Sequence, residues 1–123
     1  MSDMKPTTTD KIVRLPKELL ASDRFFVVLL QLHEDKSHQI TGAMTVAGGR
    51  SNEQRYELQG TREGNELSLW TTQPSGERTP AIHTVLADDG SFTIYPPPGS
   101  SPILHFQPSN LRRYHAVMKQ RWG

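Results

Sequence analysis

Residues 55–72 read RYELQGTREGNELSLWTT, and this stretch has the pattern of two β-strands joined by a tight turn. In its first half Tyr56 and Leu58 alternate with polar residues, and in its second half Leu67 and Leu69 do the same. Alternation with a period of two is typical of a strand that buries one face. The Gly-Asn pair between the two halves is favoured in tight hairpin turns. The stretch therefore predicts an antiparallel hairpin.

Segments on both sides of this hairpin also predict strands, which makes seven in all. HQITGAMTVA alternates in the same way, and ADDGS contains Gly90, which can adopt the positive φ of a hairpin turn. RFFVVLLQL lacks strict alternation, so it predicts a strand covered on both faces, and a helix remains an alternative there. The seven predicted strands are 24–32, 38–47, 55–60, 66–72, 81–87, 91–95 and 103–106.

Two helices are expected, one near each end of the chain. LPKELLAS has Pro16 at a position suited to a first helical turn, followed by good helix formers, and predicts a short helix over 16–21. Ser109 or Asn110 can cap a closing helix over 110–121. The apolar residues of the second helix recur on one stripe, which predicts that they pack against the body or a dimer interface. These residues are Leu111, Tyr114, Met118 and Trp122.

The predicted fold is mainly β: an antiparallel meander of about seven strands forming a barrel or sandwich, with a short N-terminal helix and a C-terminal amphipathic helix. We expect a flexible leader at 1–10 and a single domain over 11–123. The segments TGAMTV, RYELQG and ELSLW and the Asp-Asp-Gly turn, within residues 38–95, resemble calycin-like barrels of the lipocalin and streptavidin type. This resemblance implies a small barrel fold and assigns no ligand-binding residue.

The composition indicates a folded intracellular protein. The chain has 123 residues and no cysteine, which mildly favours a reducing compartment. The polar N-terminal segment has no apolar core of a signal peptide, and the longest apolar run, 25–30, is too short to span a bilayer. We therefore expect a soluble cytoplasmic protein with no membrane partner.

Charge is unevenly distributed along the chain. Residues 109–123 contain four basic residues and no acidic one, whereas residues 1–108 contain ten basic and thirteen acidic residues. A basic tail can bind nucleic acid or an acidic partner. The alternative is that the tail folds onto its own acidic body. Because four charges are few for phosphate binding, nucleic acid is the less favoured partner.

The residue types suggest one candidate ligand site in the interior of the barrel. Tyr56, Trp70, His83 and His105 would form a polar and aromatic ligand site if they all faced a barrel interior. The alternative is that each histidine is an edge or core residue satisfied by one neighbour. An interior cavity of about 300 Å³ or more would favour the ligand.

Metal binding and catalysis have weaker support. His33 and His38 lie near a predicted turn, but their spacing matches no established zinc signature, so they are weak metal candidates. The chain has no nucleophile-elbow motif, no cysteine and no phosphate-binding glycine loop. Catalytic residues and cofactors are therefore not assigned, and an enzyme is not favoured.

By elimination, the sequence favours a non-catalytic binding or adaptor protein that engages another protein through its sheet surface and C-terminal helix. The expected contact residues are Arg112, Arg113, Tyr114, Met118 and Trp122. A homo-oligomer is compatible with this interpretation. The alternatives are a small-molecule-binding barrel or simple enzyme with an interior site, and a nucleic-acid-associated factor that uses the basic helix.

Overall fold

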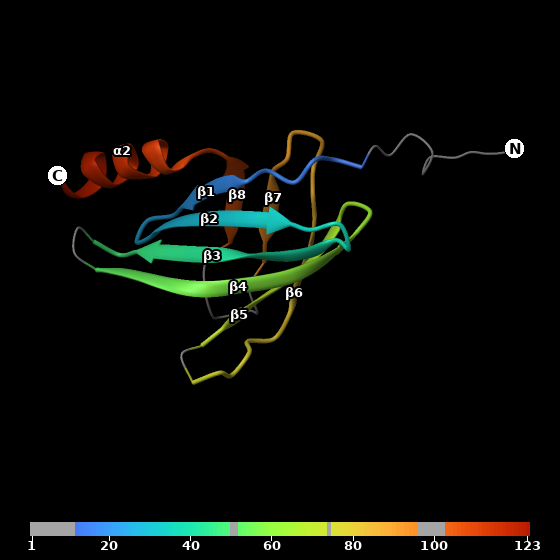
Figure 1. The fold of residues 1–123 in the computed structure, drawn as a ribbon. Helices are drawn as coiled ribbons and strands as arrows, with labels where there is room; N and C mark the ends of the chain where they lie inside the picture. The colour runs from blue at the N-terminus through green and yellow to red at the C-terminus, as the bar shows by residue number, and fades with distance from the viewer. Residues whose placement is uncertain (1–11, 50–51, 74, 96–102) are drawn as a thin grey trace, which may run out of the picture.

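The computed structural model describes residues 12–49, 52–73, 75–95 and 103–123, which form eight strands and one helix (Figure 1). The predicted leader at 1–10 lies outside these residues. The elements are β1 (Glu18–Ser22), β2 (Val27–Glu34), β3 (Gln39–Ala47), β4 (Glu53–Glu63), β5 (Glu66–Thr72), β6 (Ile82–Val85), β7 (Phe92–Ile94), β8 (Leu104–Pro108) and α2 (Leu111–Trp122).

The strands form one antiparallel meander that curls into a nearly closed barrel. Their order in the sheet is β6-β5-β4-β3-β2-β1-β8-β7, so the last strand pairs with the first and the two ends of the sheet are β6 and β7. These two strands are joined by a tight turn in which Gly90 has a φ of 87°. Across the seam between them, the Thr84 hydroxyl donates to the Thr93 carbonyl at 2.6 Å. A side-chain hydrogen bond therefore takes the place of a strand ladder.

The mainly β fold with a C-terminal helix is confirmed, and one predicted element is wrong. The predicted helix over 16–21 is instead strand β1, which pairs with β2 along its whole length. On its other side β1 pairs with β8 through Leu19 and Leu20. Helix propensity is a local preference of a few tenths of a kcal/mol per residue, and pairing on both sides overrides it here.

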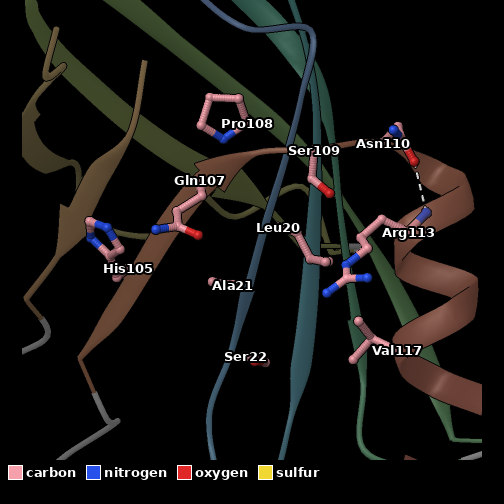
Figure 2. Close-up of a pocket in the computed structure, with 10 residues that line it drawn as sticks. All are labelled: Leu20, Ala21, Ser22, His105, Gln107, Pro108, Ser109, Asn110, Arg113 and Val117. Carbon is pink, nitrogen blue, oxygen red and sulfur yellow. Dashed lines mark hydrogen bonds between the residues drawn. The ribbon is translucent and has the colours of Figure 1, made fainter. Parts of the chain in front are cut away.

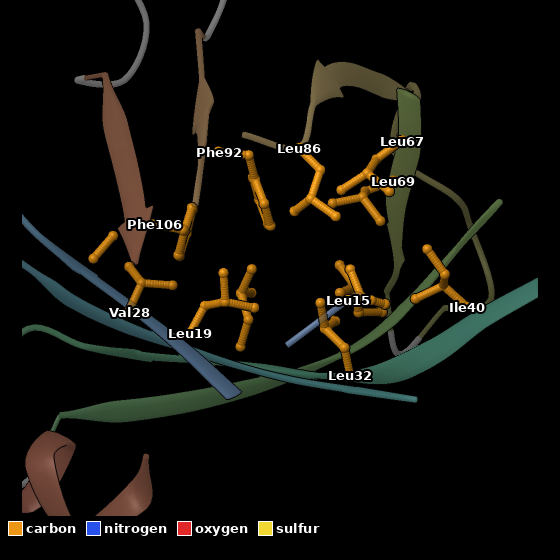
Figure 3. Close-up of a cluster of buried hydrophobic side chains, with 13 residues drawn as sticks. Leu15, Leu19, Val28, Leu32, Ile40, Leu67, Leu69, Leu86, Phe92 and Phe106 are labelled. Carbon is orange, nitrogen blue, oxygen red and sulfur yellow. The ribbon is translucent and has the colours of Figure 1, made fainter. Parts of the chain in front are cut away.

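Strand β2 is covered on both faces, as the lack of alternation in its sequence predicts. Leu30 and Leu32 belong to the cluster that fills the barrel (Figure 3). Val27 and Leu29 belong to a second cluster on the outside of the barrel, beneath α2. The interior cluster is Leu15, Leu19, Ala21, Val28, Leu30, Leu32, Ile40, Leu58, Leu67, Leu69, Leu86, Phe92 and Phe106.

Helix α2 is fixed to the barrel by its apolar stripe. Tyr114 is buried, and its hydroxyl donates to the Glu53 carboxylate at the start of β4. Burial, together with the hydrogen bond and the charge of Glu53, raises the pKa of Tyr114 above its ordinary value. Met118 and Trp122 are half-buried on the same cluster, whereas Leu111 remains 43% exposed. Apart from Leu111, the predicted stripe therefore packs against the barrel.

Gly42 shows how closely β2 and β3 approach. A Cβ atom at this position would lie 1.9 Å from the backbone oxygen of Gln31 on β2. No real Cβ atom comes this close to a carbonyl oxygen, so the two strands would have to separate.

We therefore expect Gly42→Ala to destabilise the protein by about 1–3 kcal/mol, as overpacking of a sheet centre does. Urea denaturation followed by circular dichroism measures this loss. The matched control is Gly49→Ala, because the nearest atom to a Cβ there is 3.8 Å away and its φ is not positive. Equal stability of the two variants would contradict the assigned β2–β3 register.

Candidate functional site

The interior of the barrel is divided into a packed end and a hollow end. At the end where β2, β4 and β6 finish, Leu32, Ile40 and Leu67 of the interior cluster pack together, and a smaller hollow of about 350 Å³ lies between β2 and the N-terminal segment. At the opposite end a cavity of about 590 Å³ opens. Its walls are inward-facing apolar side chains from six strands. They are Leu30, Met44, Leu58, Leu69, Ile82 and Ile94.

The rim of the cavity comes from the end of β5, the segment that leads into β6, and the end of β7. Its residues are Trp70, Thr71, Thr79, Pro80, Ala81, His83 and Tyr95. Thr71 and Thr79 hydrogen-bond each other, with 3.2 Å between their hydroxyl oxygens, and the Thr71 N–H donates to the Thr79 hydroxyl at 2.9 Å. These polar groups therefore satisfy one another. Among the described residues, no Asp, Glu, Lys or Arg lines the cavity.

The packed end is closed by a buried arginine. Arg62 is only 8% exposed, and its guanidinium donates to the Val13 carbonyl, the Glu34 carboxylate and the Asn65 side chain. Val13 lies on the N-terminal segment before β1, so the arginine ties this segment across the barrel end. Each of these hydrogen-bond partners is an acceptor, as a buried cation requires.

Glu34 also accepts a hydrogen bond from His38, at 2.8 Å. Burial alone would raise the pKa of the Glu34 carboxyl, but the hydrogen bond with His38 and the charge of Arg62 outweigh it, so this pKa lies below its ordinary value. The ionised carboxylate therefore stabilises the closed end.

The four residues of the predicted interior site do not surround one space. Trp70 and His83 border the cavity, Tyr56 does not line it, and His105 lies elsewhere. The His83 ring pairs with the Ser68 hydroxyl at 2.8 Å, and the His105 ring pairs with the Thr93 hydroxyl at 2.7 Å. Each histidine is thus an exposed residue satisfied by one neighbour, which is the alternative stated above.

Trp70 and Tyr56 are also held by specific partners. The Trp70 indole N–H donates to Gln59 at 3.1 Å, and the Arg78 guanidinium lies 4.3 Å from the centre of its ring. The Tyr56 hydroxyl donates to Gln54 on the same strand. Trp70 therefore shapes the rim of the cavity from outside the barrel.

A second hollow, of about 530 Å³, lies between α2 and strands β1 and β8 (Figure 2). It brings together His105 and Arg113, one from each predicted set of site residues, with Gln107 and Asn110 beside them. All four of these side chains are exposed. The Asn110 side chain caps α2 by accepting from the Arg113 N–H at 2.7 Å. This hollow is a polar surface groove and lacks the apolar walls of the cavity.

The remaining candidates are dispersed. Arg112 is exposed at the start of α2, and Tyr114, Met118 and Trp122 face the barrel. His33 lies on β2 opposite Thr41, and His38 occupies the turn after β2 with a φ of 64°. Within the described residues, no group of three or more His, Cys, Asp or Glu side chains is placed to hold a metal ion.

Comparisons with known proteins add no assignment: no family model, curated protein or solved structure matches this chain. Among the described helices, none is long and apolar enough to cross a membrane.

Replacing Glu34 tests the closed end. Because the folded-state pKa of Glu34 lies below its ordinary value of 4.5, its contribution to stability is present above pH 4.5 and is lost as the pH falls through the folded-state pKa. We expect Glu34→Gln to cost about 1 kcal/mol at neutral pH, with the difference from the parent protein shrinking in acid. Glu63→Gln, at the same end on an exposed residue, is the control. Urea denaturation at several pH values measures both, and a pH-independent difference would contradict the assignment.

Proposed function

We propose that the protein binds a small uncharged apolar molecule in the open end of the barrel. The observation that carries this proposal is the cavity of about 590 Å³, which lies within the range of about 300–1,000 Å³ typical of ligand pockets. An apolar wall favours a ligand that loses little hydration on entering. A carboxylate or an ammonium group would meet no opposite charge among the described wall residues, so its desolvation would oppose binding.

The calycin-like resemblance supports the same proposal. An up-and-down barrel that is packed at one end and hollow at the other suits an interior ligand. The proposal does not extend to catalysis, because the rim histidine His83 is exposed and engaged with Ser68, and the two threonines at the mouth are engaged with each other.

A second candidate function is an adaptor that engages a protein through α2. Exposure of Arg112 and Arg113 at the start of the helix favours it. Against it, Tyr114 is buried and Met118 and Trp122 contact the barrel, so the apolar stripe is already in use. A partner would therefore meet mainly polar and basic side chains.

Filling the cavity tests the ligand proposal. Ile82 points into the cavity, and Val85 lies on the same strand with its side chain 62% exposed on the outer face. We expect the parent protein to bind the uncharged dye Nile red with a rise in fluorescence. Ile82→Trp should weaken this binding by about tenfold or more, because the indole occupies the space, whereas Val85→Trp should leave it unchanged.

Two outcomes would contradict the proposal. One is an absence of Nile red binding to the parent protein. The other is equal binding by the two tryptophan variants. A further comparison tests the lack of charge: a long-chain fatty acid should bind more weakly than its methyl ester, because only the acid must lose the hydration of a carboxylate. Tighter binding of the acid would show that the ligand class is wrong.

A further inference from the structure

The turn between β1 and β2 presents two aromatic rings to solvent. Phe25 is 62% exposed and Phe26 is 40% exposed. Their ring centres lie 6.5 Å apart in an edge-to-face arrangement. Two adjacent phenylalanines on a protruding turn are an unfavourable surface in water unless a partner covers them.

This exposure is fixed by the structure of the turn. One carboxylate oxygen of Asp23 accepts from the N–H groups of Phe25 and Phe26, at 2.8 Å and 2.6 Å, and the Asp23 N–H donates to the Phe26 carbonyl at 2.9 Å. The Phe26 ring also lies beside Gly48, where an added Cβ would come within 3.1 Å of it. The backbone of the turn is therefore fixed, with the Phe26 ring beside Gly48 and the Phe25 ring the more exposed of the two.

Helix α2 places positive charge beside the rings. The Arg121 guanidinium donates to the carbonyls of Arg24 and Phe26, at 2.6 Å and 3.3 Å. Because carbonyls are neutral, these bonds do not cancel the charge. Lys119 lies in the same last turn of the helix. The C-terminal end of α2 and the β1–β2 turn lie at the same end of the barrel (Figure 1). We call Arg24, Phe25, Phe26 and Arg121, together with Lys119 on another side of the same helical turn, the aromatic tip.

Acidic residues gather at the other end of the barrel. The turns β2–β3, β4–β5 and β6–β7 all lie at the packed end of the barrel. The acidic residues in or next to these turns are Glu34, Asp35, Glu63, Glu66, Asp88 and Asp89. Lys36 and Arg62 offset part of this charge at the packed end, and Asp23 in the β1–β2 turn and Glu53 at the start of β4 offset part of the charge at the tip end. The remaining difference makes an anionic surface attract the tip more than the packed end.

We infer that the aromatic tip docks on a bilayer surface that contains anionic lipids. Phenylalanine rings can enter the boundary between headgroups and acyl chains while neighbouring arginine and lysine side chains contact the lipid phosphates. This contact needs no spanning segment, so it revises the sequence-based expectation of no membrane partner. Nucleic acid fits less well, because Arg112 and Arg113 lie at the start of α2, away from the rings.

Co-sedimentation with vesicles tests the inference. We expect binding to phosphatidylcholine vesicles that contain phosphatidylserine, and much weaker binding to phosphatidylcholine alone. Phe25→Ser should lower the partition coefficient about tenfold, since most of one ring is withdrawn from the lipid. Arg24→Gln and Lys119→Gln should each lower it about fivefold.

The chain offers matched controls for both kinds of change. Val85 is as exposed as Phe25, at 62%, but lies on the barrel wall, and Lys36 lies in the turn at the packed end. Val85→Ser and Lys36→Gln should leave vesicle binding unchanged. The inference is overturned by no vesicle binding, by equal loss in the controls, or by tip-dependent binding of an oligonucleotide without vesicle binding. Nile red binding by Phe25→Ser, expected to be unchanged, keeps this result separate from the cavity proposal.

Discussion

The rest of the structure depends on covering both faces of strand β2. Its inward residues need a closed interior, which the meander supplies by returning β8 to pair with β1. Its outward residues Val27 and Leu29 need a separate cover, which α2 supplies. Because burial of one such side chain is worth about 1.5–3 kcal/mol, leaving either face open would remove much of the marginal stability of a domain this small. The helix is thus part of the fold, and its apolar stripe, apart from Leu111, packs against the barrel.

The two ends of the barrel are built differently. At one end Arg62 gathers acceptors from β2, from the N-terminal segment and from the β4–β5 turn. At the other end the apolar side chains that line the wall leave a cavity of about 590 Å³, with the Thr71–Thr79 pair at its mouth. Leu30, Leu58 and Leu69 belong both to the packed core and to the wall of the cavity. Substitutions at these three residues would therefore affect both the stability of the fold and the proposed binding.

Local pattern was enough to find most strands, and it failed where pairing was non-local. Residues 66–72 were predicted with the bounds that β5 has, because alternation and turn chemistry agree there. Strand β1 was missed because ELLAS is rich in helix formers, and only the edges of β2 and β8 make it a strand.

The candidate site was less accessible to sequence reasoning, although one signal was present. His83 alternates with Ile82, and His105 with Leu104 and Phe106, so the outward direction of both histidines could have been read from the pattern. The cavity could not have been predicted from the sequence, because its volume depends on how far side chains from six strands reach across the barrel.

The seam between β6 and β7 has a consequence for how a bound molecule could enter. Elsewhere the perimeter of the barrel can lengthen only by breaking several backbone hydrogen bonds at once. At the seam between β6 and β7, the perimeter can lengthen when the hydrogen bond from the Thr84 hydroxyl to the Thr93 carbonyl is lost. Since Ile82 and Ile94 border the cavity on either side of this line, parting the two strands would open its side wall. If the barrel binds a molecule as proposed, parting of β6 from β7 at this line would give that molecule a lateral route to the interior without breaking a strand ladder.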